Sequence, residues 1–168
     1  YKTIPKLIKE TIDKEENYKK IAKEIYNSKD AFFIGRKIDY AYSLEGSLKL
    51  KEVSYINASA YQAGELKHGT ISLIDNNSVV FGILTDEEII SKTLSNIIET
   101  EARGANVIVI TNDKKIDYKN KILVPKVSYF TQGLLVIPTM QLIAYYTALL
   151  KNCSIDQPKN LAKSVTVE

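Results

Sequence analysis

The strongest constraint on the fold is the alternation of short apolar runs with longer segments of helical character. The apolar runs contain many β-branched and aromatic residues, and they span residues 31–34, 79–84, 106–111 and 121–124. Strands buried on both faces lack the polar alternation of half-exposed strands, and strands that alternate with helices form parallel sheets. We therefore predict an α/β fold, a three-layer αβα sandwich with a mostly parallel sheet of the flavodoxin-like or Rossmann-like kind.

Helices are expected between and around these runs. Residues 2–28 are rich in Lys and Glu, with isoleucines mainly at helical spacings, which predicts one or two amphipathic helices. Capping residues, acidic first turns and glycine stops predict three more. These are 39–56 with Asp39 as its cap, 85–103 with the capping and acidic cluster 85–88 at its start, and about 133–150.

The length of 168 residues suits one domain, which at this size buries roughly 70% of its unfolded surface without a disulfide or metal. We divide the chain into an N-terminal helical segment that packs on the domain (1–30), the domain itself (31–150) and a C-terminal tail (151–168). In open α/β sheets, ligands bind beyond the carboxyl ends of the strands. Those ends are expected at 35–36, 85–86 and 111–112, and neither a GxGxxG motif nor a P-loop follows any of them.

Charge and composition exclude several classes of protein. The net charge is only +3, the excess lies within residues 1–29, and Arg36 and Arg103 are the only arginines. Nucleic-acid binding is therefore not expected. Cys153 and His68 are the only residues of their types, which excludes a His/Cys zinc cluster within one chain and favours a reducing compartment such as the cytoplasm.

The ends of the chain give two further expectations. The most apolar run, 134–150, is shorter than the roughly 20 residues of a membrane span, so we expect a buried helix and no membrane partner. The sequence begins Tyr-Lys-Thr without Met, which suggests a piece of a longer polypeptide.

The expected helix 39–56 combines an apolar stripe with charged groups. Ala41, Leu44, Leu48 and Tyr55 fall on one side of it, which predicts a core-facing stripe. Beside that stripe, Glu45, Lys49 and Glu52 share one face. Their spacing fits a surface ion-pair ladder, and such pairs are common and weak. The alternative is a proton-transfer site, because a partly desolvated carboxylate beside an ammonium can move protons α to a carbonyl.

Two other residues allow a structural and a functional interpretation. His68 precedes Gly69, so it either ends a helix at the favourable pole of its dipole or acts as an acid–base group near neutral pH. Lys163 has apolar neighbours near the end of the chain. It is either solvated or, in a pocket that lowers its pKa, a Schiff-base nucleophile. Cys153 is interpreted as a packing residue.

Three segments together resemble one enzyme family. Residues 44–55, LEGSLKLKEVSY, resemble its LEGALKLKEISY helix, and residues 63–69, AGELKHG, match a second motif. Residues 156–168, DQPKNLAKSVTVE, resemble its carboxyl terminus DQPRNLAKSVTVE. The family is glucosamine-6-phosphate synthase, that is glutamine–fructose-6-phosphate aminotransferase (isomerizing), and the resemblance runs from about Ala31 to the last residue.

The resemblance covers only the second of two sugar-isomerase (SIS) domains. It implies a roughly five-stranded parallel sheet, so one strand is unplaced, and positions around 70–74 or 127–130 are considered. It implies a homodimer, a sugar-phosphate substrate and no metal or organic cofactor. The glutaminase domain and the first SIS domain of the family are missing from this sequence, so the chain alone is not expected to be active.

The resemblance also implies roles for individual residues. Glu52 resembles the base that moves a proton between C1 and C2 of the sugar, and Lys49 the lysine that assists it. Glu45 resembles a carboxylate that positions this machinery, and His68 the ring-opening histidine supplied by the neighbouring subunit. From helical phase and this resemblance we expect Glu45, Lys49 and Glu52 to line one pocket at the carboxyl edge of the sheet, which His68 of a second subunit can reach. Lys163 resembles the lysine that forms an imine with the open-chain ketose, and Ala162 a substrate contact through its backbone.

The implied reaction is the isomerising amination of fructose 6-phosphate. Ammonia from glutamine replaces O2, and a proton then moves from C1 to C2 to give glucosamine 6-phosphate. A fructosamine-phosphate deglycase and a non-catalytic sugar-phosphate-binding SIS module are the alternatives. The NLAKSVTVE ending favours the synthase over the deglycase, and the pair Glu52 and Lys163 argues against a module without catalysis.

Overall fold

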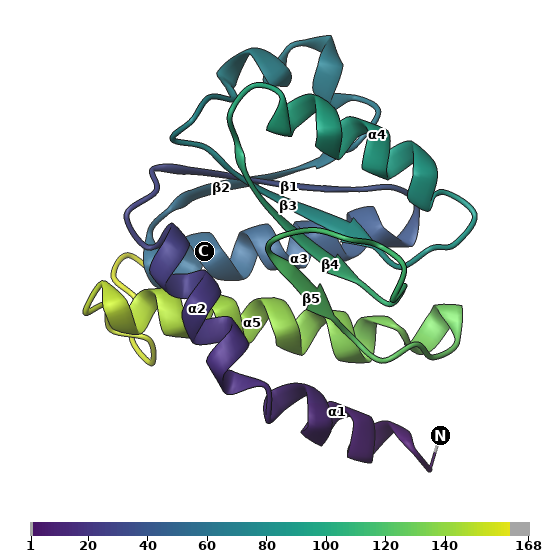
Figure 1. The fold of residues 1–168 in the computed structure, drawn as a ribbon. Helices are drawn as coiled ribbons and strands as arrows, with labels where there is room; N and C mark the ends of the chain where they lie inside the picture. Colours follow the sequence, from purple (N-terminus) through teal and green to yellow (C-terminus); the bar gives the residue numbers. More distant parts are fainter. Residues whose placement is uncertain (1, 162–168) are drawn as a thin grey trace, which may run out of the picture.

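A five-stranded parallel sheet forms the middle layer of the computed structural model, which describes residues 2–161 (Figure 1). The strand order is β2-β1-β3-β4-β5, and all four neighbouring pairs are parallel. The strands are β1 (Asp30–Gly35), β2 (Asn57–Gln62), β3 (Val79–Leu84), β4 (Asn106–Thr111) and β5 (Lys121–Leu123). The predicted α/β class and the parallel sheet are confirmed.

The strand left unplaced by the sequence is β2, at one edge of the sheet. Neither position considered for it is a strand, because Thr70–Leu73 and Tyr129–Thr131 are 3₁₀ turns. Ala58 is the only buried residue of β2, and the strand lacks an apolar run. An edge strand covered on one side needs fewer apolar residues than a central one, which explains why its sequence gave no strand signal.

Helices cover both faces of the sheet and complete the three layers (Figure 1). On one face lie α3 (Ile38–Ser54) and α5 (Gly133–Leu150), with α1 (Ile4–Ile12) and α2 (Glu15–Ile25) packed on α5. The other face is covered by α4 (Ile90–Glu101) and the 3₁₀ turns that follow β2. Adjacent residues of β1 alternate between these layers, since Phe33 stacks on Phe81 in one apolar cluster and Phe32 lies in the other.

The predicted core-facing stripe of α3 is wrong, because its residues face outward. Leu44 and Leu48 are 48% and 41% exposed. The buried face consists instead of Asp39, Tyr42, Ser43, Gly46, Ser47, Leu50 and Ser54. The hydroxyl groups of the three serines donate to carbonyl oxygens of their own helix, so burying them leaves no unmet hydrogen bond. A Cβ at Gly46 would lie 2.8 Å from Phe33 Cε1, so small residues allow α3 to pack closely on the sheet.

The two predicted caps also have other roles in the structure. Asp39 lies inside the first turn of α3, which begins at Ile38. Its carboxylate accepts hydrogen bonds from Thr85 and Asp86 at the end of β3. The helix predicted from 85 begins at Ile90, because Thr85 and Asp86 are used in this contact.

Helix α5 follows the prediction for residues 133–150. The segment Tyr129–Leu150 is long and apolar enough to cross a membrane by composition, but half of the apolar window is buried inside the structure. Core helices of globular proteins pass the same test, and α5 packs against α1, α2 and α3.

Candidate functional site

Glu45, Lys49 and Glu52 form one cluster on α3, here called the acid–amine cluster. Lys49 Nζ donates to Glu52 Oε2 at 2.8 Å and lies 3.9 Å from Glu45 Oε1. Each of the three side chains is between a quarter and a third exposed. The hydrogen bond to Glu52 raises the pKa of Lys49, so the amine stays an ammonium beside two carboxylates. The predicted shared face is therefore confirmed.

The position of this cluster differs from what we expected. We expected it at the carboxyl edge of the sheet, where ligands of such folds commonly bind. Helix α3 starts at that edge, after β1, and runs back toward the amino edge (Figure 1). Glu52 lies fourteen residues beyond Ile38, which is about 20 Å along a helix. The cluster thus lies on the flank of the domain and away from the carboxyl edge.

Two shallow hollows border the cluster. One, of about 370 Å³, lies between α3 and α5 and includes Lys49, Val53 and Tyr145. The other, of about 560 Å³, lies between α3 and β2 and includes Glu45, Leu44 and Leu48. The acid–amine cluster with the exposed Leu44 and Leu48 is called the outer face of α3 below. This face provides proton-transfer groups and apolar surface, but residues 2–161 do not enclose them in a deep pocket.

His68 lies apart from the acid–amine cluster. It is exposed in the 3₁₀ turn Leu66–His68, which follows the carboxyl end of β2. The six residues of β2 separate this turn from the end of α3 by about 20 Å of strand. His68 and Glu52 of one chain therefore lie toward opposite edges of the sheet, and the fold does not bring them together within one chain.

The described part of the tail returns to the end of α3. The Lys159 backbone N–H donates to the Tyr55 hydroxyl at 2.8 Å, and the Lys159 ammonium lies 4.6 Å from the centre of that ring. Tyr55 is three residues beyond Glu52. Ala162 and Lys163, the predicted tail residues of the site, lie outside the described residues.

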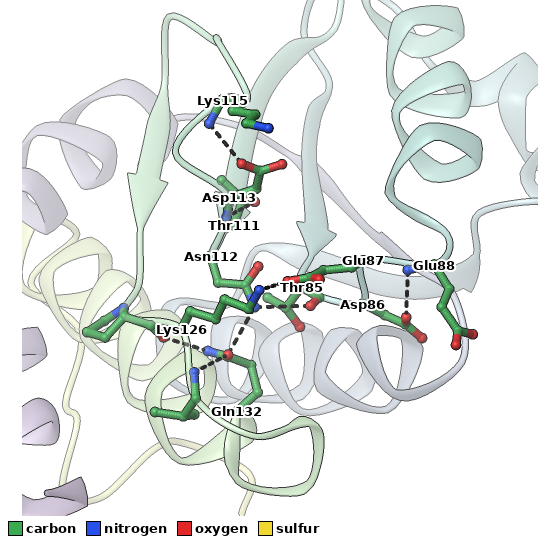
Figure 2. A network of polar contacts seen from close by, with 12 residues as sticks. Thr85, Asp86, Glu87, Glu88, Thr111, Asn112, Asp113, Lys115, Lys126 and Gln132 are labelled. Atoms are coloured by element: carbon green, nitrogen blue, oxygen red, sulfur yellow. Dashed lines mark hydrogen bonds and ion pairs between the residues drawn. The ribbon is translucent and has the colours of Figure 1, made fainter.

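A second polar assembly, which the sequence analysis missed as a site, lies at the carboxyl ends of β3 and β4 (Figure 2). Asn112 donates to Thr85 O and to Gln132 Oε1, both at 3.0 Å. Burial raises the pKa of the Asp39 carboxyl group beneath it, although the bonds from Thr85 and Asp86 act in the opposite direction. The strand-end rule indicated 85–86 and 111–112, but nothing in the sequence indicated Gln132.

A metal ion is not indicated within residues 2–161. They contain no group of three His, Cys, Asp or Glu side chains that could hold one. The acid–amine cluster provides two carboxylates and an ammonium, and the ammonium already occupies the position between them. This arrangement suits proton transfer better than metal binding.

Comparisons with known proteins agree on one family. The family described as "SIS domain" matches residues 24–151. The chain is 45% identical to a glutamine–fructose-6-phosphate aminotransferase [isomerizing] of Caldanaerobacter subterraneus and 46% identical to that of Clostridium tetani, over 99% of its own length in each case. It spans only 28% of the length of these relatives.

Solved structures give the same result for the fold. The C-terminal domain of glucosamine-fructose-6-phosphate aminotransferase from Francisella tularensis matches with a TM-score of 0.87 and 31% identity. The match covers 93% of this chain and 45% of that one. A glucosamine-6-phosphate deaminase of Thermotoga maritima matches at 22% identity with a TM-score of 0.75, over 95% of this chain and 48% of that one, which supports the fold alone.

Proposed function

The chain belongs to the SIS domain family, and on that premise we propose that it is the carboxyl-terminal isomerase part of a glutamine–fructose-6-phosphate aminotransferase (isomerizing). The observation that supports this most is the acid–amine cluster, which presents a carboxylate hydrogen-bonded to an ammonium on an outward surface. The identity of about 45% to enzymes with this name, over nearly the whole chain, supports the same assignment.

In this proposal Glu52 removes a proton from C1 of the aminated sugar and returns it to C2. The neighbouring carbonyl or imine carbon acidifies that proton. The Lys49 ammonium donates to Glu52 Oε2 at 2.8 Å and so fixes the position of that carboxyl group. Glu45, one turn earlier, holds the ammonium from its other side. A base positioned in this way contributes roughly 10²–10⁴-fold to the rate.

Three residues act around this step. Lys163 forms an imine with the open-chain ketose, and the backbone of Ala162 contacts the substrate. The contact of Lys159 with Tyr55 supports the role of Lys163. Lys159 lies four residues before Lys163, and its contact brings the tail to the end of α3 that carries Glu52. His68 opens the sugar ring in the site of a second subunit, which its distance from Glu52 along β2 supports.

The remaining walls of the site come from elsewhere. The outer face of α3 is open on two sides, and its leucines are about half exposed. We assign its covering to a glutaminase and first SIS domain of the parent polypeptide, since the chain spans 28% of its relatives. The working enzyme in this proposal is a cytoplasmic homodimer that uses fructose 6-phosphate and glutamine-derived ammonia.

Borohydride trapping tests the proposal. The parent polypeptide is mixed with fructose 6-phosphate, reduced with borohydride and mapped by peptide mass analysis. We expect the sugar on Lys163, and we expect Lys163→Arg to abolish trapping and synthesis, because arginine keeps the charge but cannot form the imine. Lys159→Arg, at the lysine four residues earlier, is the matched control and should trap normally.

The opposite results are equally clear. Trapping on a different lysine, or normal synthesis by Lys163→Arg, would contradict the imine role. Consumption of a fructosamine phosphate with release of ammonia, and no synthesis from glutamine, would assign the chain to a deglycase. Binding of fructose 6-phosphate without any turnover would assign it to a non-catalytic module.

A further inference from the structure

One side chain at the end of α3, that of Tyr55, makes two different interactions with the C-terminal tail. The Tyr55 hydroxyl oxygen accepts from the Lys159 backbone N–H at 2.8 Å. The Tyr55 ring faces the Lys159 ammonium, which lies 4.6 Å from its centre. The two residues are 104 positions apart in the sequence, so this pair of interactions, called the tail contact below, fixes a distant segment on the domain.

Neither the backbone nor the core explains an aromatic residue at position 55. Tyr55 ends α3 with a φ of +58°, in the left-handed region where glycine or asparagine is usual. Its side chain is 36% exposed, and among the described residues it belongs to neither apolar cluster of the core. The tail contact, in contrast, uses both the ring and the hydroxyl group of this side chain.

The two halves of the tail contact can be separated by substitution. The hydrogen bond needs the hydroxyl oxygen, and at a partly exposed position it favours the closed tail by roughly 2–10-fold. The cation–π interaction needs only the ring and adds roughly 2–5-fold. Phenylalanine at position 55 therefore removes one interaction, and leucine removes both.

The tail contact lies close to the acid–amine cluster. Tyr55 is three residues beyond Glu52, which is about 5 Å along a helix axis. Lys163 follows Lys159 by four residues, a length of chain that spans at most about 14 Å. Fixing Lys159 at Tyr55 therefore confines the Lys163 amine to the neighbourhood of the end of α3 that carries Glu52.

We propose that Tyr55 is a positioning residue, which holds the tail at Lys159 and so keeps the Lys163 amine beside the sugar. The effect on Lys163 rests on the proposed function, whereas the fixing of the tail by Tyr55 does not. Tyr55 needs no contact with the substrate in this role. Lys159→Arg, the control of the trapping experiment, keeps the backbone N–H and a cation over the ring, so it leaves the tail contact in place.

Trypsin cleavage of the 168-residue chain after Lys159 tests the fixing of the tail. Cleavage needs a tail that has left Tyr55, so its rate follows the population of the open tail. Formation of the fragment 1–159, measured by mass, should be ~2–10-fold faster in Tyr55→Phe and faster still in Tyr55→Leu. Tyr40→Phe, at a half-buried tyrosine in the first turn of α3, is the matched control and should be cleaved as the unmodified chain is.

Equal cleavage rates in Tyr55→Phe and Tyr40→Phe would show that the hydroxyl group does not hold the tail, and would overturn the proposal. Tyr55→Phe removes a single partly exposed oxygen atom, so it decides the test even if Tyr55→Leu fails to fold.

Borohydride trapping in the parent polypeptide tests the effect on Lys163. Tyr55→Phe should trap fructose 6-phosphate on Lys163 more slowly than Tyr40→Phe, and Tyr55→Leu at least ~3-fold more slowly, because both interactions are lost. A role confined to stability would leave the trapping rate per folded molecule unchanged, and that result would overturn the positioning role. If the unmodified enzyme traps no sugar on Lys163, the proposed function fails, and the trypsin experiment still decides whether Tyr55 holds the tail.

Discussion

Two polar regions of the molecule are built in opposite ways: the outer face of α3, and the carboxyl-edge network of Asp39, Thr85, Asn112 and Gln132. The acid–amine cluster comes from two turns of one helix, and its groups bond to each other in partial contact with solvent. The carboxyl-edge network is assembled from several segments, and buried hydrogen bonds connect its four residues. In our proposal another part of the parent polypeptide completes the first region, whereas the second is held together by hydrogen bonds among residues 2–161.

The difference implies that the two regions respond differently to mutation. Partly exposed ion pairs on a helix contribute only a few tenths of a kcal/mol to stability. Buried side chains that satisfy several backbone groups contribute much more, because their loss leaves those groups unpaired. Substitutions in the acid–amine cluster should therefore leave the free energy of unfolding almost unchanged, whereas substitutions in the carboxyl-edge network should lower it.

The largest effect is expected from Glu52→Gln in the parent polypeptide. It should lower kcat for glucosamine 6-phosphate formation by roughly 10²–10⁴-fold, because it removes the proposed base. The unfolding free energy of the chain should change by less than about 1 kcal/mol. Glu99→Gln, on α4 at the other face of the sheet, is the control and should keep full activity. Comparable activity of the two variants would contradict the role of Glu52.

Gln132→Ala should instead act on stability. Gln132 is buried and joins three segments, since Oε1 accepts from Asn112 and Val127 and Nε2 donates to Pro125 O. Its loss should lower the unfolding free energy by about 2–4 kcal/mol, as measured by urea denaturation. Gln141→Ala, at an exposed glutamine of α5, should stay within about 0.5 kcal/mol. Equal stability of the two variants would show that the network is not structural.

Asp39 gives the stability of the carboxyl edge a pH dependence at mildly acidic pH. Burial raises the pKa of its carboxyl group in the folded chain above the unfolded value of about 3.9. Between these two pKa values the folded chain binds a proton that the unfolded chain has lost. The unfolding free energy contributed by Asp39 therefore rises as pH falls through this window, by at most about 1.4 kcal/mol per pH unit.

The contribution of Asp39 is measured by urea denaturation of the unmodified chain and of Asp39→Asn across mildly acidic pH. The stability of the unmodified chain relative to Asp39→Asn should increase as the pH falls, since the other carboxyl groups cancel in the comparison. A relative stability that decreases with falling pH would mean that the bonds from Thr85 and Asp86 outweigh burial and lower the pKa of Asp39.

The smallest effect is expected from Leu48→Ala on the outer face. Because Leu48 is 41% exposed, the unfolding free energy should change by no more than about 0.5 kcal/mol. Leu50→Ala, two residues along the same helix but 1% exposed, should cost about 2–5 kcal/mol. If both substitutions destabilise the isolated chain equally, the outer face is not an open surface.

Local sequence signals predicted the central strands and the acid–amine cluster, because both follow from neighbours along the chain. The strand β2 and the buried face of α3 could not be predicted in this way. Ala58 is the only buried residue of β2, and Ser43, Gly46 and Ser47 are buried because α3 packs closely on Phe33. The apolar spacing on α3 predicted a core-facing stripe, but within residues 2–161 no segment buries Leu44 and Leu48, which are 48% and 41% exposed.

The carboxyl-edge network depends on contacts that sequence spacing does not encode. Thr85 and Asp86 suggest a helix cap, but their partner is Asp39, more than forty residues away. Gln132 lies in no recognisable motif. Its role follows from its hydrogen bonds, in which it accepts from Asn112 and donates to Pro125 O. The strand-end rule located this edge of the sheet but not its chemistry.

Hydroxyl-radical footprinting tests most directly whether the outer face of α3 is completed by another part of the parent polypeptide. Leu44 and Leu48 should be labelled in the isolated 168-residue chain and protected in the parent polypeptide. Leu50, buried on the same helix, should stay unlabelled in both and serve as the control for unfolding. Equal labelling of Leu44 and Leu48 in the isolated chain and in the parent polypeptide would contradict the account.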